Sequence, residues 1–102
     1  MKSRNVVFKK PNDEPKVIET DFSFKALQNL IGGNIKSMPL DSQLDVIFNE
    51  NAIDQKCELN IAFNGNIIAG NVIIIATDGF MWRGLSNKET KNIIKFLKKQ
   101  QI

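Results

Sequence analysis

The sequence predicts one α+β domain, in which a mixed or antiparallel sheet of about four or five strands carries one packed helix and the chain ends in a second helix. The 102 residues suffice for one hydrophobic core and show no repeat, low-complexity linker or composition change, so we expect residues 1–102 to form a single domain. Several short runs are rich in β-branched residues, which favour strands. Two other segments space their apolar residues at intervals of three or four, as amphipathic helices do.

The first third of the chain predicts two extended segments followed by a helix. Residues 6–8 and 16–20 flank a loop, residues 11–15, that has Pro at both ends. Because the prolines suit the edge of a sheet, residues 16–20 are either the hairpin partner of the first strand or an extended lead-in. Residues 24–31 carry a helical apolar stripe. The caps of this helix are expected to be Ser23 or Asp21 at the start and Gly32 with Gly33 at the end.

The middle of the chain predicts two strands and a loop. Residues 34–40 and 43–50 are the strand candidates, and the second alternates so as to give one buried face and one mixed face. Residues 51–58 are polar and typical of a loop. Residues 59–64 predict a single helical turn with Asn60 as its cap.

The last third predicts the central strand and the second helix. Residues 67–77 are expected to form one strand, and the consecutive apolar residues 72–75 need cover on both faces of the sheet. Ser86 and Glu89 match a capping box, so we expect a helix that runs from there to about Lys99.

Composition argues against most enzymatic mechanisms. The chain has no His, no Tyr and one Cys, so the side chains that most often act as metal ligands, bases or nucleophiles are nearly absent. Glu50 could pair with Glu58 or Asp54 as catalytic carboxylates, but no pocket is defined for them. We therefore expect no catalytic residue, no metal and no cofactor.

The charge distribution and the single cysteine indicate which classes of partner and which cellular compartment to expect. The net charge of +3 comes mostly from five lysines near the C-terminus: Lys88, Lys91, Lys95, Lys98 and Lys99. The only arginines are Arg4 and Arg83, which argues against nucleic acid as a partner. Cys57 has no internal disulfide partner, no signal peptide is visible, and the most apolar run, residues 67–76, is about half as long as a membrane span. These features predict a cytoplasmic protein without membrane contact.

A series of short motifs resembles a known family. The motifs are, in order, Leu27-Gln28, Gly32-Gly33, Asn49-Glu50, Asn60 and Gly70. Their order and spacing resemble a small family of domains of unknown function that occurs in bacteriophages, plasmids and other mobile elements of bacteria. The resemblance implies an accessory protein in the cytoplasm of the host cell, and it brings no established activity or ligand.

The leading hypothesis for function is a non-enzymatic accessory protein of a phage or mobile element that binds a host or phage protein. We expect the contact at Phe80, Met81, Trp82 and Arg83, because consecutive large apolar side chains between two glycines are hard to bury and such residue types are enriched where proteins meet. The alternative is that Phe80 and Trp82 fold back over the sheet as core. A homodimer through this segment, or through an open strand edge, would satisfy both interpretations.

The second hypothesis is a binder of a nucleotide-like small molecule that sequesters a host defence signal. Asn49, Glu50 and Asn60 carry it, because a strand end and a nearby turn can aim amide and carboxylate groups at one point. The alternative is that these side chains bond the backbone of their own loops.

Overall fold

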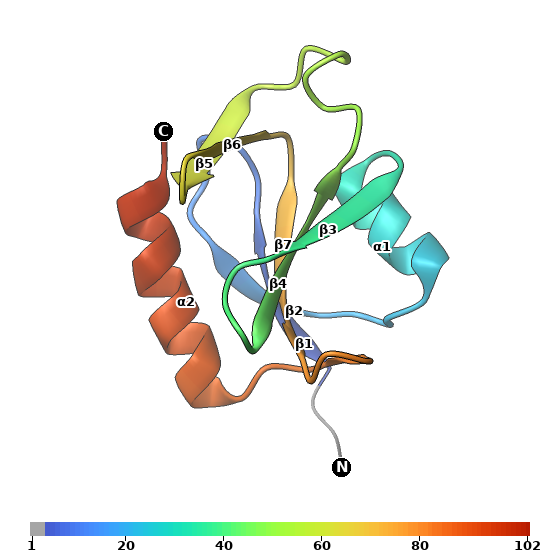
Figure 1. Cartoon of the computed structure of the whole chain (residues 1–102), viewed down its shortest axis with the longest axis vertical. Coiled ribbons are helices and arrows are strands. Elements are labelled where there is room, and N and C mark those ends of the chain that lie inside the picture. Colours follow the sequence, from blue (N-terminus) through green and yellow to red (C-terminus); the bar gives the residue numbers. More distant parts are fainter. Residues whose placement is uncertain (1–3) are drawn as a thin grey trace.

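The computed structural model describes residues 4–102, and this part of the chain contains two helices and eight strands arranged in three layers (Figure 1). In chain order the elements are β1 (Asn5–Lys9), β2 (Lys16–Glu19), α1 (Phe24–Ile31), β3 (Ile35–Pro39), β4 (Leu44–Asn49), β5 (Leu59–Phe63), β6 (Asn66–Ala69), β7 (Val72–Thr77), β8 (Trp82–Arg83) and α2 (Asn87–Gln100). The main sheet forms the middle layer. α1 covers one face, while α2 and the β5–β6 hairpin cover the other.

The main sheet is antiparallel, with the strand order β2-β1-β7-β4-β3, and the short β8 pairs with the end of β7. The predicted α+β class is therefore confirmed, and the sheet is the antiparallel one of the two forms expected. β2 is the hairpin partner of β1 and lies at the sheet edge, which suits the two prolines of the loop before it. β7 is the central strand.

The two faces of β7 enter two separate cores. Ile74 packs toward α2 together with residues of β5 and β6, whereas Ile73 and Ile75 pack toward α1. All three side chains are fully buried. The cover on both faces that residues 72–75 predicted is confirmed, and burying each such side chain contributes about 1.5–3 kcal/mol.

Both helices begin at their predicted caps. The Ser23 hydroxyl accepts a hydrogen bond from the backbone N–H of Ala26, and α1 ends at Gly32, whose φ of +82° is left-handed. α2 begins with the predicted capping box, in which the side chains of Ser86 and Glu89 each bond the other's backbone N–H. No helix within residues 4–102 combines the length and the apolar character needed to cross a membrane.

The expectation of a helical turn at residues 59–64 is wrong. This segment is the strand β5, and it forms a hairpin with β6 over the α2 face of the main sheet. The turn between them is Asn64-Gly65, where both residues have positive φ. Asn-Gly is a strong hairpin signal, and with this turn β5 has a neighbouring strand with which to pair.

The expectation of one strand over residues 67–77 is also wrong. The chain turns at Gly70, whose φ is +79°, so β6 joins the small hairpin and β7 enters the main sheet. On the face of β4 that was expected to be mixed, Ile47 is buried under α1 and Asp45 is partly exposed. The apolar run of residues 67–77 does not by itself show which layer of the fold each part of it joins.

Candidate functional site

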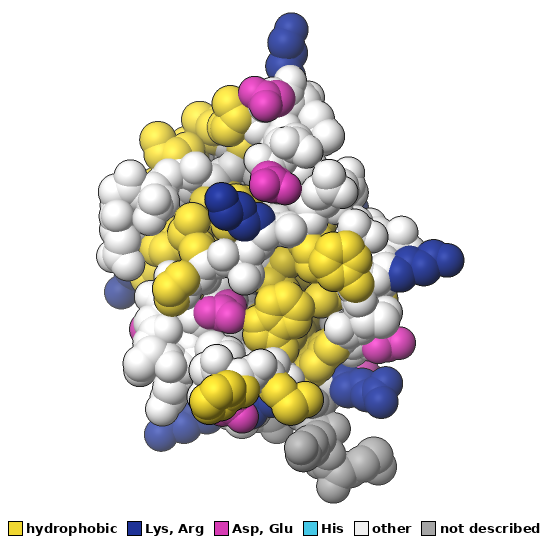
Figure 2. All heavy atoms as spheres, turned by 45° about the vertical axis from the view of Figure 1, so that its right-hand side comes forward, with side chains coloured by type: hydrophobic (Ala, Val, Ile, Leu, Met, Phe, Trp, Pro, Cys, Tyr) yellow, Lys and Arg dark blue, Asp and Glu magenta, His cyan; other side chains and the backbone are white. Residues whose placement is uncertain are grey.

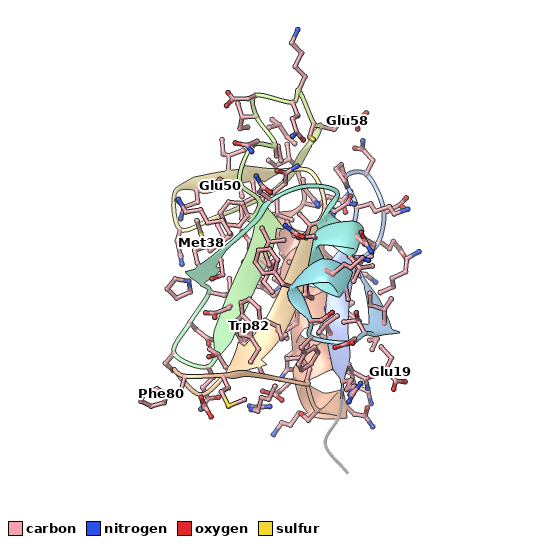
Figure 3. All side chains as sticks on the ribbon, turned by 90° about the vertical axis from the view of Figure 1, so that its right-hand side faces the viewer. Glu19, Met38, Glu50, Glu58, Phe80 and Trp82 are labelled. Carbon is pink, nitrogen blue, oxygen red and sulfur yellow. The ribbon has the colours of Figure 1, made fainter. Side chains whose placement is uncertain are left out.

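The four residues predicted to contact a protein lie in and beside the turn between β7 and β8. Phe80 is 96% exposed and Met81 is 72% exposed. In Figure 3, Phe80 points away from the domain, whereas Trp82 lies against the sheet. Isolated exposed apolar residues are ordinary, but two neighbours at the tip of a turn next to a partly exposed Trp form an apolar prominence.

Polar groups of the turn itself hold its shape. One carboxylate oxygen of Asp78 accepts hydrogen bonds from the backbone N–H groups of Phe80, at 2.9 Å, and Met81, at 3.0 Å. The Thr77 hydroxyl accepts from the N–H of Gly79 at 3.0 Å and donates to the carbonyl of Met81 at 3.3 Å. The bonds from Met81 and Phe80 lower the pKa of the Asp78 carboxyl below its usual value. The turn is therefore ordered without any contribution from its two exposed apolar side chains.

Trp82 belongs partly to the core and partly to the surface. Its ring packs beside the core under α1, and its Nε1–H donates to the Asp45 carboxylate at 2.9 Å. It also lines a surface hollow of about 360 Å³ with Asp45 and one of about 470 Å³ with Phe22 and Arg4. Figure 2 shows hydrophobic side chains exposed on this face of the molecule, from its upper part through the middle to its lower end. Trp82 thus anchors the turn while leaving part of its ring accessible.

Arg83 is already engaged within the domain. Its guanidinium makes two hydrogen bonds to the Glu89 carboxylate, both at 3.1 Å, and a third to the carbonyl of Gly84. The pairing with Arg83, together with the backbone N–H of Ser86, lowers the pKa of Glu89 to about 2. Arg83 therefore ties β8 to the start of α2. Of the four predicted residues, the two with the most free surface are Phe80 and Met81.

The first two residues of the alternative site lie at the end of β4. Asn49 is buried, and its amide accepts from the backbone N–H of Asn51 and donates to the side chain of Gln55, both at 2.9 Å. Glu50 is exposed, and Figure 3 shows it beside the end of β4. Asn49 and Glu50 together line a hollow of about 110 Å³ beside β6, and Asn49 without Glu50 also lines a shallow hollow of about 480 Å³ with Gln55 and Glu58. Ligand pockets usually measure roughly 300–1,000 Å³.

Asn60, the third residue, is fully buried in β5 and faces the end of β1. Its Nδ2 donates to the carbonyl of Lys9 at 3.0 Å and to that of Gly70 at 2.8 Å. Its Oδ1 accepts from the Lys9 ammonium at 2.5 Å. Both donor hydrogens and one acceptor position of the amide are used inside the protein, which is how Asn side chains commonly satisfy buried backbone groups.

Lys9 is a buried polar residue that the sequence reasoning missed. Its ammonium donates to the Asn60 side chain and, at 3.2 Å, to the carbonyl of Lys10. Burial lowers the pKa of Lys9, and the Asp13 carboxylate opposes this effect. The alternation of side chains along a strand could have revealed this burial. Val7 points to the buried α2 face, and Lys9, two positions further along β1, points to the same face.

Several residues that carry the family resemblance contact one another at one end of the sheet. Gly33 lies against Asn49, since a Cβ on Gly33 would be only 2.8 Å from Nδ2 of that side chain. Asn60 bonds Gly70 in the same region. Within residues 4–102, no group of three Cys, Asp or Glu side chains could hold a metal ion. Through these contacts the motif residues hold the loops against the ends of β4, β5 and β7.

Comparison with known proteins identifies a family for the whole fold. The model of a family described as a domain of unknown function, DUF3846, matches residues 1–98. No curated protein and no solved structure matches the chain. Because the match covers nearly all of the 102 residues, the chain belongs to the DUF3846 family of domains of unknown function.

Proposed function

We propose that this protein is a non-enzymatic accessory protein that binds another protein through the tip surface, defined as Phe80, Met81, Trp82 and Arg83. The observation that carries the proposal is the exposure of Phe80 and Met81 on a turn ordered by its own polar groups. A partner that buried an exposed side chain of this size would gain about 1.5–3 kcal/mol from the apolar area removed from water. An ordered turn also loses little conformational entropy on binding.

The four residues divide into anchors and supports. Phe80 and Met81 are the anchors, because their side chains are free to enter a partner. Trp82 and Arg83 hold the turn through Asp45 and Glu89 and add a rim beside the anchors. Aromatic, Met and Arg side chains of this kind are enriched at protein interfaces.

The partner we propose is a host or phage protein in the cytoplasm of the host cell. The resemblance to proteins of bacteriophages, plasmids and other mobile elements supports this choice. A second copy of the chain, joined through the same tip surface, is the other protein partner to test. The competing function is the binding of a nucleotide-like molecule at Asn49, Glu50 and Asn60, and the internal hydrogen bonds of the two buried amides do not favour it.

The test is capture of a partner by the wild-type chain and by Phe80→Ser/Met81→Ser in bacterial cells that express them. Phe24→Ser/Ile67→Ser is the matched control, because its two side chains are also more than 60% exposed but lie elsewhere. We expect the tip variant to capture about tenfold less partner than the wild type does, and the control to capture as much as the wild type. The melting temperatures of the three proteins should agree within about 3 °C.

Three results would count against the proposal. They are the absence of any partner enriched by the wild type, equal capture by both variants, and strong destabilisation of the tip variant. A rise of several degrees in melting temperature with a nucleotide, abolished by Asn49→Ala but not by the tip variant, would favour the competing function.

A further inference from the structure

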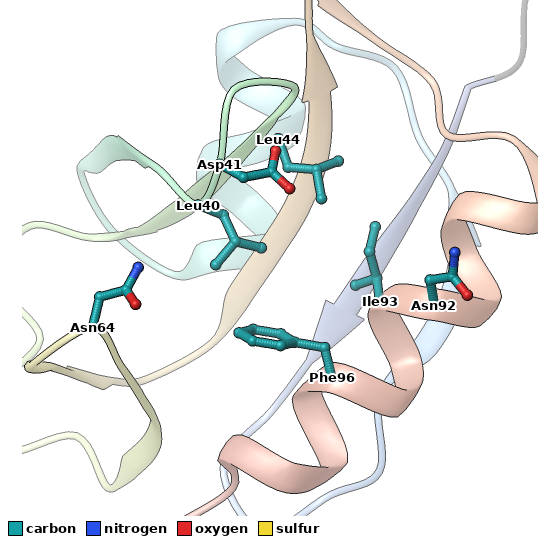
Figure 4. Close-up of a pocket in the computed structure, with 7 residues that line it drawn as sticks. All are labelled: Leu40, Asp41, Leu44, Asn64, Asn92, Ile93 and Phe96. Carbon is teal, nitrogen blue, oxygen red and sulfur yellow. The ribbon is translucent and has the colours of Figure 1, made fainter.

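An apolar groove lies between α2 and the β3–β4 turn, on the face of the sheet opposite α1 (Figure 4). Its volume is about 350 Å³, and Asn64 of the β5–β6 turn closes one end. The walls are formed by Leu40, Asp41, Leu44, Asn64, Asn92, Ile93 and Phe96. Leu40, Leu44 and Phe96 are partly buried hydrophobic side chains that pack on the core. The groove therefore continues the apolar core out to the surface and has room for an apolar side chain.

A row of lysines borders the groove along α2. Lys88 and Lys95 lie four and three positions from Asn92, and Lys99 lies three positions from Phe96, so helix geometry places each of them next to a residue of the groove. All three lysines are exposed. None of them forms an ion pair with any residue between 4 and 102, where the recorded ion pair joins Arg83 and Glu89.

The acidic residue of the groove lies across from this row. Asp41 is part of the β3–β4 turn, and its carboxylate accepts the backbone N–H of Gln43 at 2.7 Å. Glu89 of α2, three positions from Asn92, is neutralised by its pairing with Arg83, so the net charge of the α2 side is positive and the turn side is acidic. A partner would be oriented by this difference, with its own negative charges over α2.

We propose that this groove binds an acidic amphipathic segment of a partner protein. An apolar side chain of the segment enters between Leu40 and Phe96, and carboxylates about one helical turn away meet Lys88, Lys95 and Lys99. The apolar walls favour a peptide over nucleic acid, because phosphate would gain nothing from them and α2 carries no Arg for bidentate contact. The groove shares no residue with the tip surface, of which Trp82 packs against the core under α1.

The test uses fluorescence anisotropy with designed probes on the full chain. The first probe is a labelled helical peptide of about 16 residues, with Leu at helical spacing and Glu elsewhere. A second probe replaces each Leu by Ser, and a third replaces each Glu by Lys. The protein variant is K88Q/K95Q/K99Q, and the matched control is K16Q/K25Q/K36Q, which removes three exposed lysines from β2, α1 and β3.

We expect the first probe to bind the wild type and to weaken by about tenfold with K88Q/K95Q/K99Q, as the loss of three exposed ion pairs implies. The control should change affinity by less than about twofold, and the Ser probe should bind at least about tenfold more weakly than the Leu probe. Circular dichroism should show the same melting temperature for all proteins within about 3 °C, because the altered lysines are exposed.

Several results would overturn the proposal. Failure of the first probe to bind better than the Lys probe would show that the surface does not select acidic segments. Equal losses in the two lysine variants would show unspecific charge attraction. Tighter binding of duplex DNA or phosphatidylserine vesicles than of the first probe would assign the lysines to nucleic acid or membrane. A dimer of the wild type that K88Q/K95Q/K99Q dissociates in sedimentation would assign the groove to a second copy of the chain.

Discussion

The contribution of Asn60 to the stability of the fold can be measured directly. In Asn60→Ala the Lys9 ammonium loses its side-chain acceptor, a bond to a charged group worth about 1.5–3 kcal/mol. The carbonyls of Lys9 and Gly70 also lose the Asn60 donor, and a buried carbonyl that is left unpaired by this loss costs about 1–3 kcal/mol. Water in the vacated space would recover part of this sum, so we expect a loss of about 4 kcal/mol in the free energy of unfolding.

The assay is urea unfolding followed by circular dichroism at pH 7. Asn66→Ala is the control, because Asn66 is exposed and its one recorded side-chain bond is long, at 3.4 Å, so its loss should stay within about 0.5 kcal/mol. The double variant Lys9→Met/Asn60→Ala should be about 2 kcal/mol more stable than Asn60→Ala alone, because no charge then stays buried without its partner.

Two results would refute this reasoning. A loss below about 1 kcal/mol in Asn60→Ala would show that the buried amide contributes little to the fold. A double variant no more stable than Asn60→Ala would show that the Lys9 charge is not the source of the cost.

Three further predictions concern pH dependence and close packing. Because the pKa of Glu89 falls from 4.5 to about 2 on folding, the ion pair should stabilise the wild type fully above about pH 4.5 and be lost as the pH falls toward 2. Glu89→Gln should therefore lower the free energy of unfolding by about 1–2 kcal/mol at pH 7, after allowance for solvent screening, and by almost nothing at pH 2. An equal loss at both pH values would contradict this prediction. Gly33→Ala should cost about 2 kcal/mol in urea unfolding, because the new Cβ displaces the bonded Asn49 side chain, and wild-type stability would refute the close contact. The lowered pKa of Lys9 means that the unfolded chain binds more protons as the pH approaches 10.5, so stability should rise with pH in that range and Lys9→Met should remove the rise; identical slopes would disprove it.

The elements that could be predicted from the sequence depend on neighbours a few positions apart. Ser23 and Gly32 bound α1, and Ser86 with Glu89 starts α2, because capping is completed within one turn of the chain. The central place of β7 was predictable from the consecutive apolar residues 72–75, because a strand with one face in solvent would alternate apolar and polar residues. The exposure of at least one large apolar side chain in this segment was predictable, since a short turn offers no layer to cover it, but that Phe80 is exposed while Trp82 packs on the core was left open.

The errors share one physical cause. Residues 59–64 have a local pattern that suits a strand or a helical turn, and the choice depends on pairing with β6. The break at Gly70 separates two layers of the fold, which a continuous apolar run does not reveal. Short apolar segments carry too little periodicity to distinguish these cases.

Local chemistry along the chain is enough to place the helix ends, the exposed turn and the strand at the centre of the sheet, because each depends on hydrogen bonds or burial within a few residues. Assembly of the layers creates the rest. Lys9 and Asn60 are 51 positions apart, and only the packing of β5 over the end of β1 makes them a buried pair. The groove beside α2 likewise joins three segments distant in the chain. Contacts of this kind depend on which strands meet, a choice settled by the burial of the whole core.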